Sequence, residues 1–143
     1  MDLLAILDVI TPITTYILFV SPIPSLYKAF SNGTMDAISP VPYLMGLLCS
    51  FVLFYYGLVT ESNILITVNT VGGILSSFYL LAYYITISNK TNVLKHLTSL
   101  LVAVGSIIVI TRAMPTHDSS VWILGIMGSI INVLTMGAPL SEL

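Results

Sequence analysis

Residues 62–89 read SNILITVNTVGGILSSFYLLAYYITISN, a stretch between Glu61 and Lys90 with no charged side chain. A helix needs about 20 mostly apolar residues to cross the hydrocarbon core of a bilayer. This stretch is longer than that, and apolar residues dominate it from end to end. We therefore predict a membrane-spanning helix at 64–87.

Charged residues divide the rest of the sequence into further uncharged stretches of similar length. They predict five membrane-spanning helices in all, at 5–27, 41–59, 64–87, 96–112 and 119–138. The apolar runs do not alternate with polar residues, which disfavours the strands of a transmembrane barrel. Hydrophobic residues make up 57% of the chain and charged residues 7%, whereas roughly 25% of the residues of a typical soluble domain are charged. The predicted fold class is an all-α polytopic membrane protein.

The same composition excludes several classes of function. Only 4 residues are Lys or Arg, too few for a phosphate-neutralising patch, so we expect no nucleic-acid partner. Cys49, His96 and His117 lack the spacing of metal ligands, and we expect no metal and no cofactor. No nucleophile–base pair and no phosphate-cradling loop occurs, so we predict no catalytic residues and no enzyme activity.

The distribution of basic residues predicts the orientation in the membrane. Lys28, Lys90 and Lys95 fall in loops on one side, and Arg112 falls on the other. Cytoplasmic loops carry the excess of Lys and Arg. We therefore expect the N-terminus outside and the three lysines in the cytoplasm.

Prolines stand at the ends of three predicted helices. Pro22 lies far along an apolar stretch, where a missing N–H breaks or kinks a helix. Pro42 follows Pro40 at the start of the second helix, where a first-turn proline with no special role is an equal alternative. Pro139 recurs in a setting similar to that of Pro22 near the end of the fifth helix.

The most informative polar residue is Asn69, which lies in the middle of its span. Gly72, Gly73 and Ser76 follow it at helical spacing and place small side chains on one face. One interpretation is close helix packing, with the amide bonded across the contact. The other is a polar cavity in which Asn69 hydrogen-bonds a neutral, hydroxylated substrate. No span carries a charged residue at its centre, which argues against a proton relay or a charged substrate.

Four segments, in their order and spacing, resemble the first half of a SWEET (MtN3/saliva-type) sugar transporter. The resemblance covers about residues 10–88 and returns at 119–140. The segments are SPIPSLYK at 21–28, SPVPY at 39–43, FYYGL at 54–58 and TVNTVG at 67–72, and the later match runs through MGAPL at 136–140.

The resemblance implies an architecture that composition alone does not. Family members have seven helices in two parallel three-helix repeats joined by a linker helix, with the sugar bound between the repeats. It implies a three-helix repeat at 1–90, a linker helix at 91–113 and the first helix of an incomplete second repeat at 114–143. It also implies passive, bidirectional transport of small neutral sugars by alternating access.

The resemblance further implies roles for individual residues. Asn69 matches the sugar-binding asparagine of the first repeat. Leu53 matches a pocket position where the family can have a small polar residue. The implied residues are Asn69, Leu53 and Gly72 for substrate binding, Tyr56 for the extracellular gate, and Pro22, Pro42 and Pro139 for the hinges.

We expect one copy of this chain, truncated after the fifth helix, not to enclose the family's site. The leading hypothesis is a homo-oligomer that carries a mono- or disaccharide and is surrounded by membrane lipid. The alternative is a non-transporting subunit that binds and regulates full-length relatives through an exposed face bearing Gly125, Gly128 and Asn132. A third possibility is that the chain is part of a longer transporter. The resemblance favours the plasma membrane, with vacuolar or other endomembranes as alternatives.

Overall fold

The computed structural model describes residues 3–33, 35–36 and 38–137, which form six helices. Together they provide five spans that are long and apolar enough to cross a membrane, because α1 and α2 make up the first span between them. The predicted all-α polytopic membrane fold is confirmed. The helices are α1 (Leu3–Val20), α2 (Ile23–Ser31), α3 (Val41–Val59), α4 (Asn63–Thr86), α5 (Lys90–Arg112) and α6 (His117–Gly137).

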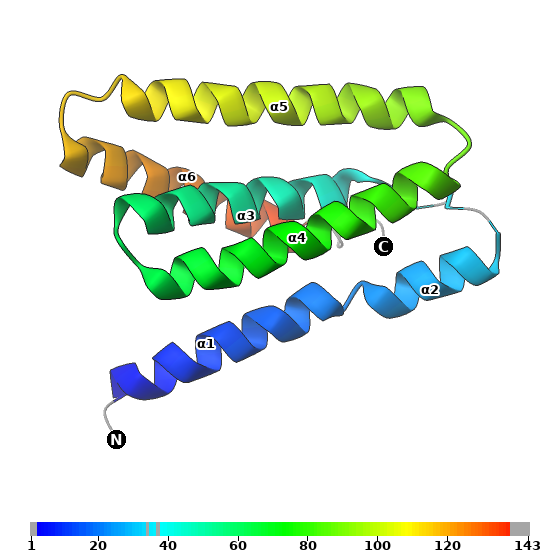
Figure 1. Ribbon diagram of the computed structural model, residues 1–143, viewed down its shortest axis with the longest axis horizontal. Coiled ribbons are helices and arrows are strands. Elements are labelled where there is room, and N and C mark those ends of the chain that lie inside the picture. Colours follow the sequence, from blue (N-terminus) through cyan, green and yellow to red (C-terminus); the bar gives the residue numbers. More distant parts are fainter. Residues whose placement is uncertain (1–2, 34, 37, 138–143) are drawn as a thin grey trace.

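Helix α3 lies at the centre of the bundle. It packs against α4, α6 and α5, whereas α1 packs against α4. Figure 1 shows α4 between α3 and the α1–α2 pair, with α5 on the opposite side of the molecule. Helix α4 therefore packs against α3 on one side and against α1 on another.

The first span is broken where the sequence places Pro22. Helix α1 ends at Val20, and α2 resumes at Ile23 with Pro22 as its N-cap. The break follows from the chemistry of proline, which has no N–H to bond the carbonyl four residues earlier. The span therefore runs beyond the expected 5–27, to Ser31, as two helices with a bend between them.

The fourth span is longer than predicted. Helix α5 begins at Lys90, not at residue 96, and takes Lys95 into its second turn. Both lysines are exposed, and the Lys90 ammonium lies 5.4 Å from the centroid of the Tyr84 ring. Long basic side chains can extend their charge to the membrane surface while the helix continues beneath them. The helix therefore starts at Lys90 and continues through Lys95, which does not mark its beginning.

A tight turn joins α3 to α4. Glu61 has a φ of 55°, the left-handed conformation that commonly ends a helix. The Ser62 N–H then donates to the Gly57 carbonyl at 2.9 Å, and the Ser62 hydroxyl accepts from the Leu65 N–H at 3.5 Å. The turn satisfies backbone groups at both helix ends and sets α3 and α4 side by side.

At the other end of the bundle, two loops are linked by hydrogen bonds. The Asp36 carboxylate accepts from the Ser88 N–H at 3.1 Å and from the Ser88 hydroxyl at 2.8 Å. Asp36 precedes α3 and Ser88 follows α4, so the α2–α3 and α4–α5 connections lie at the same end of the molecule.

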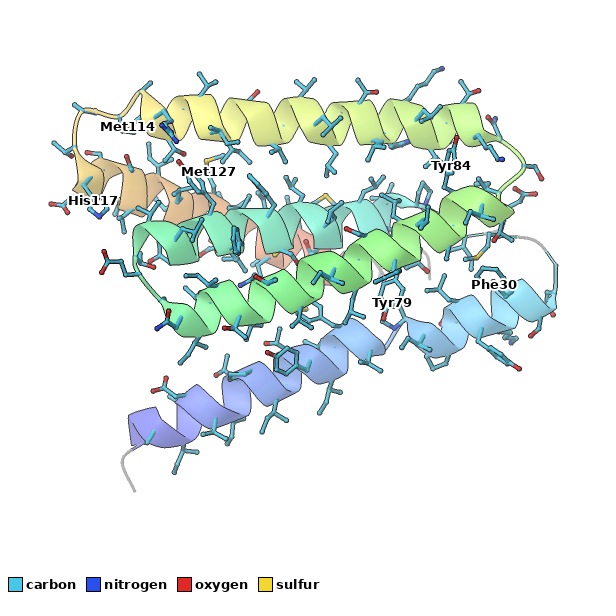
Figure 2. All side chains as sticks on the ribbon, viewed as in Figure 1. Phe30, Tyr79, Tyr84, Met114, His117 and Met127 are labelled. Carbon is cyan, nitrogen blue, oxygen red and sulfur yellow. The ribbon has the colours of Figure 1, made fainter. Side chains whose placement is uncertain are left out.

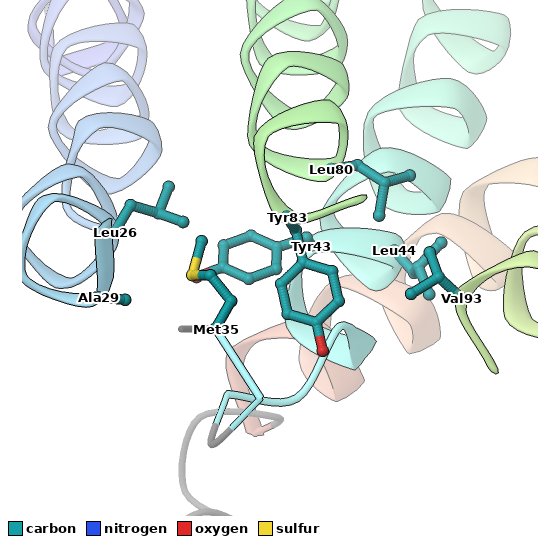
Figure 3. Packing of buried hydrophobic residues seen from close by; sticks show 8 residues of the cluster. All are labelled: Leu26, Ala29, Met35, Tyr43, Leu44, Leu80, Tyr83 and Val93. Carbon is teal, nitrogen blue, oxygen red and sulfur yellow. The ribbon is translucent and has the colours of Figure 1, made fainter. Parts of the chain in front are cut away.

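Buried apolar residues form two clusters. The first joins α2, α3, α4 and α5 near the Asp36 end, and within it the Tyr83 hydroxyl donates to the Ile38 carbonyl at 2.7 Å. The second joins α3, α5 and α6. Figure 3 shows the first cluster, which consists of Leu26, Ala29, Met35, Tyr43, Leu44, Leu80, Tyr83 and Val93; the second consists of Val52, Ile107 and Leu124.

The face of α6 that bears Gly125, Gly128 and Asn132 packs against α3 at Gly128, whereas Asn132 is exposed, so the expected exposure holds only in part. Gly128 is buried, and a Cβ there would lie 2.9 Å from Cδ2 of Leu53. One turn later the Cys49 thiol donates to Oδ1 of Asn132 at 3.8 Å. Small residues let two helices approach closely, and here α6 packs closely against α3 at Gly128.

This contact predicts a stability change. Gly128→Val should lower the midpoint of thermal unfolding in detergent, because a branched side chain has to displace Leu53, and overpacking of this kind typically costs about 1–3 kcal/mol. Gly105→Val on α5 is the matched control, since no atom lies within 4 Å of a Cβ at that position. Adding Leu53→Ala should restore part of the loss. Equal midpoints for the two valine variants would contradict the packing described.

Candidate functional site

A groove of about 490 Å³ runs between α3 and α4 and includes Asn69. Its polar lining consists of uncharged side chains, and its walls are apolar and aromatic. It is open along one side, so the described part of the chain encloses it only partly. The polar residues are Ser50, Asn69, Thr70 and Ser77, and the aromatic residues are Phe51, Phe54 and Phe78.

Asn69 is buried on α4, and its side chain bonds within its own helix. Its Nδ2 donates to the Leu65 carbonyl at 2.8 Å, the only hydrogen bond of this side chain among the described residues. Among the described residues the amide thus makes no hydrogen bond across a helix contact. An amide has two N–H donors and an oxygen with two lone pairs. One donor and the oxygen remain for a ligand in the groove.

The two glycines after Asn69 point to different neighbours. A Cβ at Gly73 would lie 3.9 Å from Cβ of Ser50, so Gly73 lines the groove beside α3. A Cβ at Gly72 would overlap the ring of Phe19 on α1. Gly72, one of the predicted substrate-binding residues, therefore seats α1 against α4 and is not among the residues that line the groove.

Leu53 and Tyr56 lie on the side of α3 that faces α6. Leu53 contacts Gly128, and a Cβ at Gly125 would lie 3.6 Å from the Tyr56 ring. Tyr56 also lines a second, open hollow of about 500 Å³ with Asp118, Trp122 and Ser129. The structure therefore does not bring the predicted gate residue Tyr56, or Leu53, into the groove that contains Asn69.

The predicted hinge prolines differ in their setting. Pro22 stands at the break between α1 and α2, with its carbonyl accepting from the Leu26 N–H at 3.0 Å. Pro42 is the second residue of α3, directly after Val41, where a helix N–H has no partner in any case. Pro42 thus bends no helix here. Pro139 lies outside the described residues.

Sequence reasoning gave no role to Tyr79 or to Phe54. Phe54 lines the groove, and the Tyr79 hydroxyl donates to the Phe19 carbonyl at 2.7 Å across the α4–α1 contact. A tyrosine within an apolar span looks the same in sequence whether it faces lipid or another helix. No group of three or more His, Cys, Asp or Glu side chains that could hold a metal ion occurs in the part of the chain that the structure describes.

Residues 5–92 match a protein-family model described as "Sugar efflux transporter for intercellular exchange". This match covers more than half of the 143 residues and both helices that form the groove. The chain belongs to the SWEET (MtN3/saliva) family. The resemblance seen in the four sequence segments is confirmed.

Individual SWEET relatives extend the match beyond the first three spans. Sugar transporter SWEET1 of Drosophila pseudoobscura pseudoobscura is 31% identical over 92% of this chain and 59% of that protein. Bidirectional sugar transporter NEC1 of Petunia hybrida is 26% identical over 98% of this chain and 54% of its own. Sugar transporter SWEET1 of Caenorhabditis elegans is 29% identical over 98% of this chain and 46% of its own.

These comparisons set the level at which function is known. The SWEET family comprises sugar transporters, not enzymes, and this chain is an integral membrane protein of that family. The chain spans about half the length of most of the curated relatives it matches.

Proposed function

We propose that this chain transports small neutral sugars across a membrane, passively and in both directions, by alternating access. The observation that carries the proposal is the Asn69 amide in a groove whose lining has no charged side chain. Amide and hydroxyl groups both donate and accept, which suits the neutral hydroxyls of a mono- or disaccharide. Membership of a sugar transporter family supports the same substrate class.

In this proposal, different groove residues contact different parts of the sugar. The free N–H and the oxygen of Asn69 bond to sugar hydroxyls, and the Ser50 and Ser77 hydroxyls lie along the same groove. The Phe54 ring offers an apolar surface to the C–H face of a sugar. No described groove residue has an ionisable side chain, so the groove offers no proton carrier, in keeping with the proposed passive transport.

The groove needs a second wall before it can exclude water from both sides. We propose that a second three-helix repeat supplies it, from another copy of this chain or from further residues of a longer one. Residues 1–90 act as the first repeat, 91–113 as the linker helix and 114–143 as the first helix of the second repeat. Where another copy supplies the second repeat, the two Asn69 residues face a shared sugar, and α2 moves relative to α1 at the Pro22 break.

The proposed setting is the plasma membrane, with the N-terminus outside and the α2–α3 and α4–α5 loops in the cytoplasm. Lys28 and Lys90 support this orientation, because both lie toward the end of the bundle that carries the Asp36–Ser88 link. The regulatory-subunit alternative keeps part of the α6 face on which it rests, because Asn132 is exposed although Gly128 is buried.

The test is uptake of radiolabelled glucose and sucrose into liposomes that contain the purified protein, with cross-linking to measure its size. We expect saturable uptake, exchange in both directions, no dependence on an ion gradient, and a dimer or larger species. Protein that inserts correctly but takes up neither sugar would contradict self-sufficient transport. Co-expression with a full-length relative would then test the regulatory alternative.

A further inference from the structure

The break between α1 and α2 exposes backbone carbonyls that an unbroken helix would satisfy. Pro22 has no N–H to bond the Leu18 carbonyl, and α1 ends at Val20, one residue after Phe19. No water is available in a bilayer core to replace the missing donors, so exposed carbonyls there are costly. The Leu18 carbonyl keeps one backbone donor, the Ser21 N–H at 3.3 Å, whereas the Phe19 carbonyl depends on a donor from elsewhere in the protein.

Two hydroxyl groups also donate to carbonyls at the break. The Ser21 hydroxyl, next to the break, donates to the Leu18 carbonyl at 2.8 Å. The Tyr79 hydroxyl, from α4, donates to the Phe19 carbonyl at 2.7 Å. Figure 2 shows Tyr79 between α4 and the break in the first span. The first bond is local to the bend, whereas the second ties the bend to a different helix.

Helix α4 therefore holds Phe19 at two points. The Phe19 ring lies over Gly72, and the Phe19 carbonyl accepts from Tyr79 two turns further along α4. The Tyr79 ring is itself supported by Tyr43 of α3, with ring centroids 6.1 Å apart. The Tyr79 hydroxyl thus links the tightly packed α3–α4 pair to the break between α1 and α2.

We propose that Tyr79 is a positioning residue for the Pro22 hinge, whose hydroxyl stabilises the bent conformation by bonding the Phe19 carbonyl. This inference rests on the proposed function, in which α2 swings at Pro22 during transport. Tyr79 is not among the residues that line the Asn69 groove. Its hydroxyl should therefore affect the equilibrium between conformations and not the contacts made with the sugar.

The test compares Tyr79→Phe with Tyr84→Phe. Both variants remove a tyrosine hydroxyl from α4 and keep the ring. Tyr84 lies beside Lys90, away from the break, and phenylalanine preserves that ring contact. Spin labels are attached to cysteines that replace Tyr27 of α2 and Leu101 of α5, whose side chains are 75% and 64% exposed. The native cysteine is removed by Cys49→Ala. Figure 1 places these two helices on opposite sides of the bundle. Labelled protein is diluted with unlabelled protein in liposomes, so that only distances within one chain are measured.

We expect Tyr79→Phe to shift the ratio of distance populations by about fivefold, the factor that corresponds to one typical net hydrogen bond. In uptake, kcat should change, and Tyr84→Phe should match the parent in both measurements. Distances unchanged by Tyr79→Phe would overturn the inference, as would an equal shift in Tyr84→Phe. The distance measurement needs no transport, so it decides the role of Tyr79 even if uptake fails and the proposed function falls.

Discussion

Asn69→Ala is expected to reduce saturable sugar uptake at least tenfold while the protein still inserts into the membrane. The change removes the donor and the acceptor that the side chain leaves open to the groove. A lost hydrogen bond to a ligand in a buried site costs about 1–3 kcal/mol, and tenfold corresponds to about 1.4 kcal/mol. The one internal bond that disappears, from Nδ2 to the Leu65 carbonyl, lies within α4 and is replaced by a residue that favours helix.

The uptake measurement uses liposomes, with rates normalised to the amount of inserted protein. Asn63→Ala is the matched control, because it removes an amide from the exposed start of the same helix, outside the groove. Asn69→Asp should also transport poorly, since a carboxylate cannot donate to the Leu65 carbonyl and brings a charge into an apolar setting. Uptake at the parent rate in Asn69→Ala would show that the α3–α4 groove is not the sugar site.

Gly72→Ala is expected to destabilise the protein strongly, even though it adds a single methyl group. That methyl group would overlap the Phe19 ring, so α1 has to move away from α4. Overpacking of this kind costs about 1–3 kcal/mol. If α1 moves away from α4, the hydrogen bond from the Tyr79 hydroxyl to the Phe19 carbonyl is also lost. The measurement is the midpoint of thermal unfolding in detergent micelles.

The neighbouring glycine provides the control for this prediction. Gly73→Ala adds the same methyl group at the next position, where the nearest described atom is Cβ of Ser50 at 3.9 Å. It should leave the unfolding midpoint almost unchanged. Phe19→Ala combined with Gly72→Ala should be more stable than the sum of the two single changes predicts. If Gly72→Ala and Gly73→Ala unfold at the same temperature, Phe19 does not sit where the structure places it.

Sequence was sufficient where a feature depends only on local chemistry. The number of spans follows from uncharged stretches of membrane length, and the break in the first span follows from the missing N–H of Pro22. The start of α5 was placed too late for a reason that is also local. Lys90 and Lys95 look like the end of an apolar segment, but their flexible side chains allow the helix to continue beneath them.

The candidate site was predicted only in part. Asn69 stood out because an amide in mid-span is rare and costly without a partner. Leu53 and Tyr56 were grouped with it by family resemblance, and the structure places them on the α6 side of α3. Residues on one helix point in directions about 100° apart at each step, so a position in sequence does not identify the neighbour that a side chain meets.

The sequence by itself determined the five spans, the bend at Pro22 and the presence of a neutral, hydrogen-bonding residue in mid-membrane. Only the tertiary structure decided that Gly72 packs against the Phe19 ring while Gly73 lines the groove. It also decided that the Tyr79 hydroxyl bonds the Phe19 carbonyl beside the break between α1 and α2. Span and bend depend on residues that are consecutive in the chain. Contacts between α1 and α4 depend on the rotation of each helix about its axis, which is set by packing against every neighbour at once.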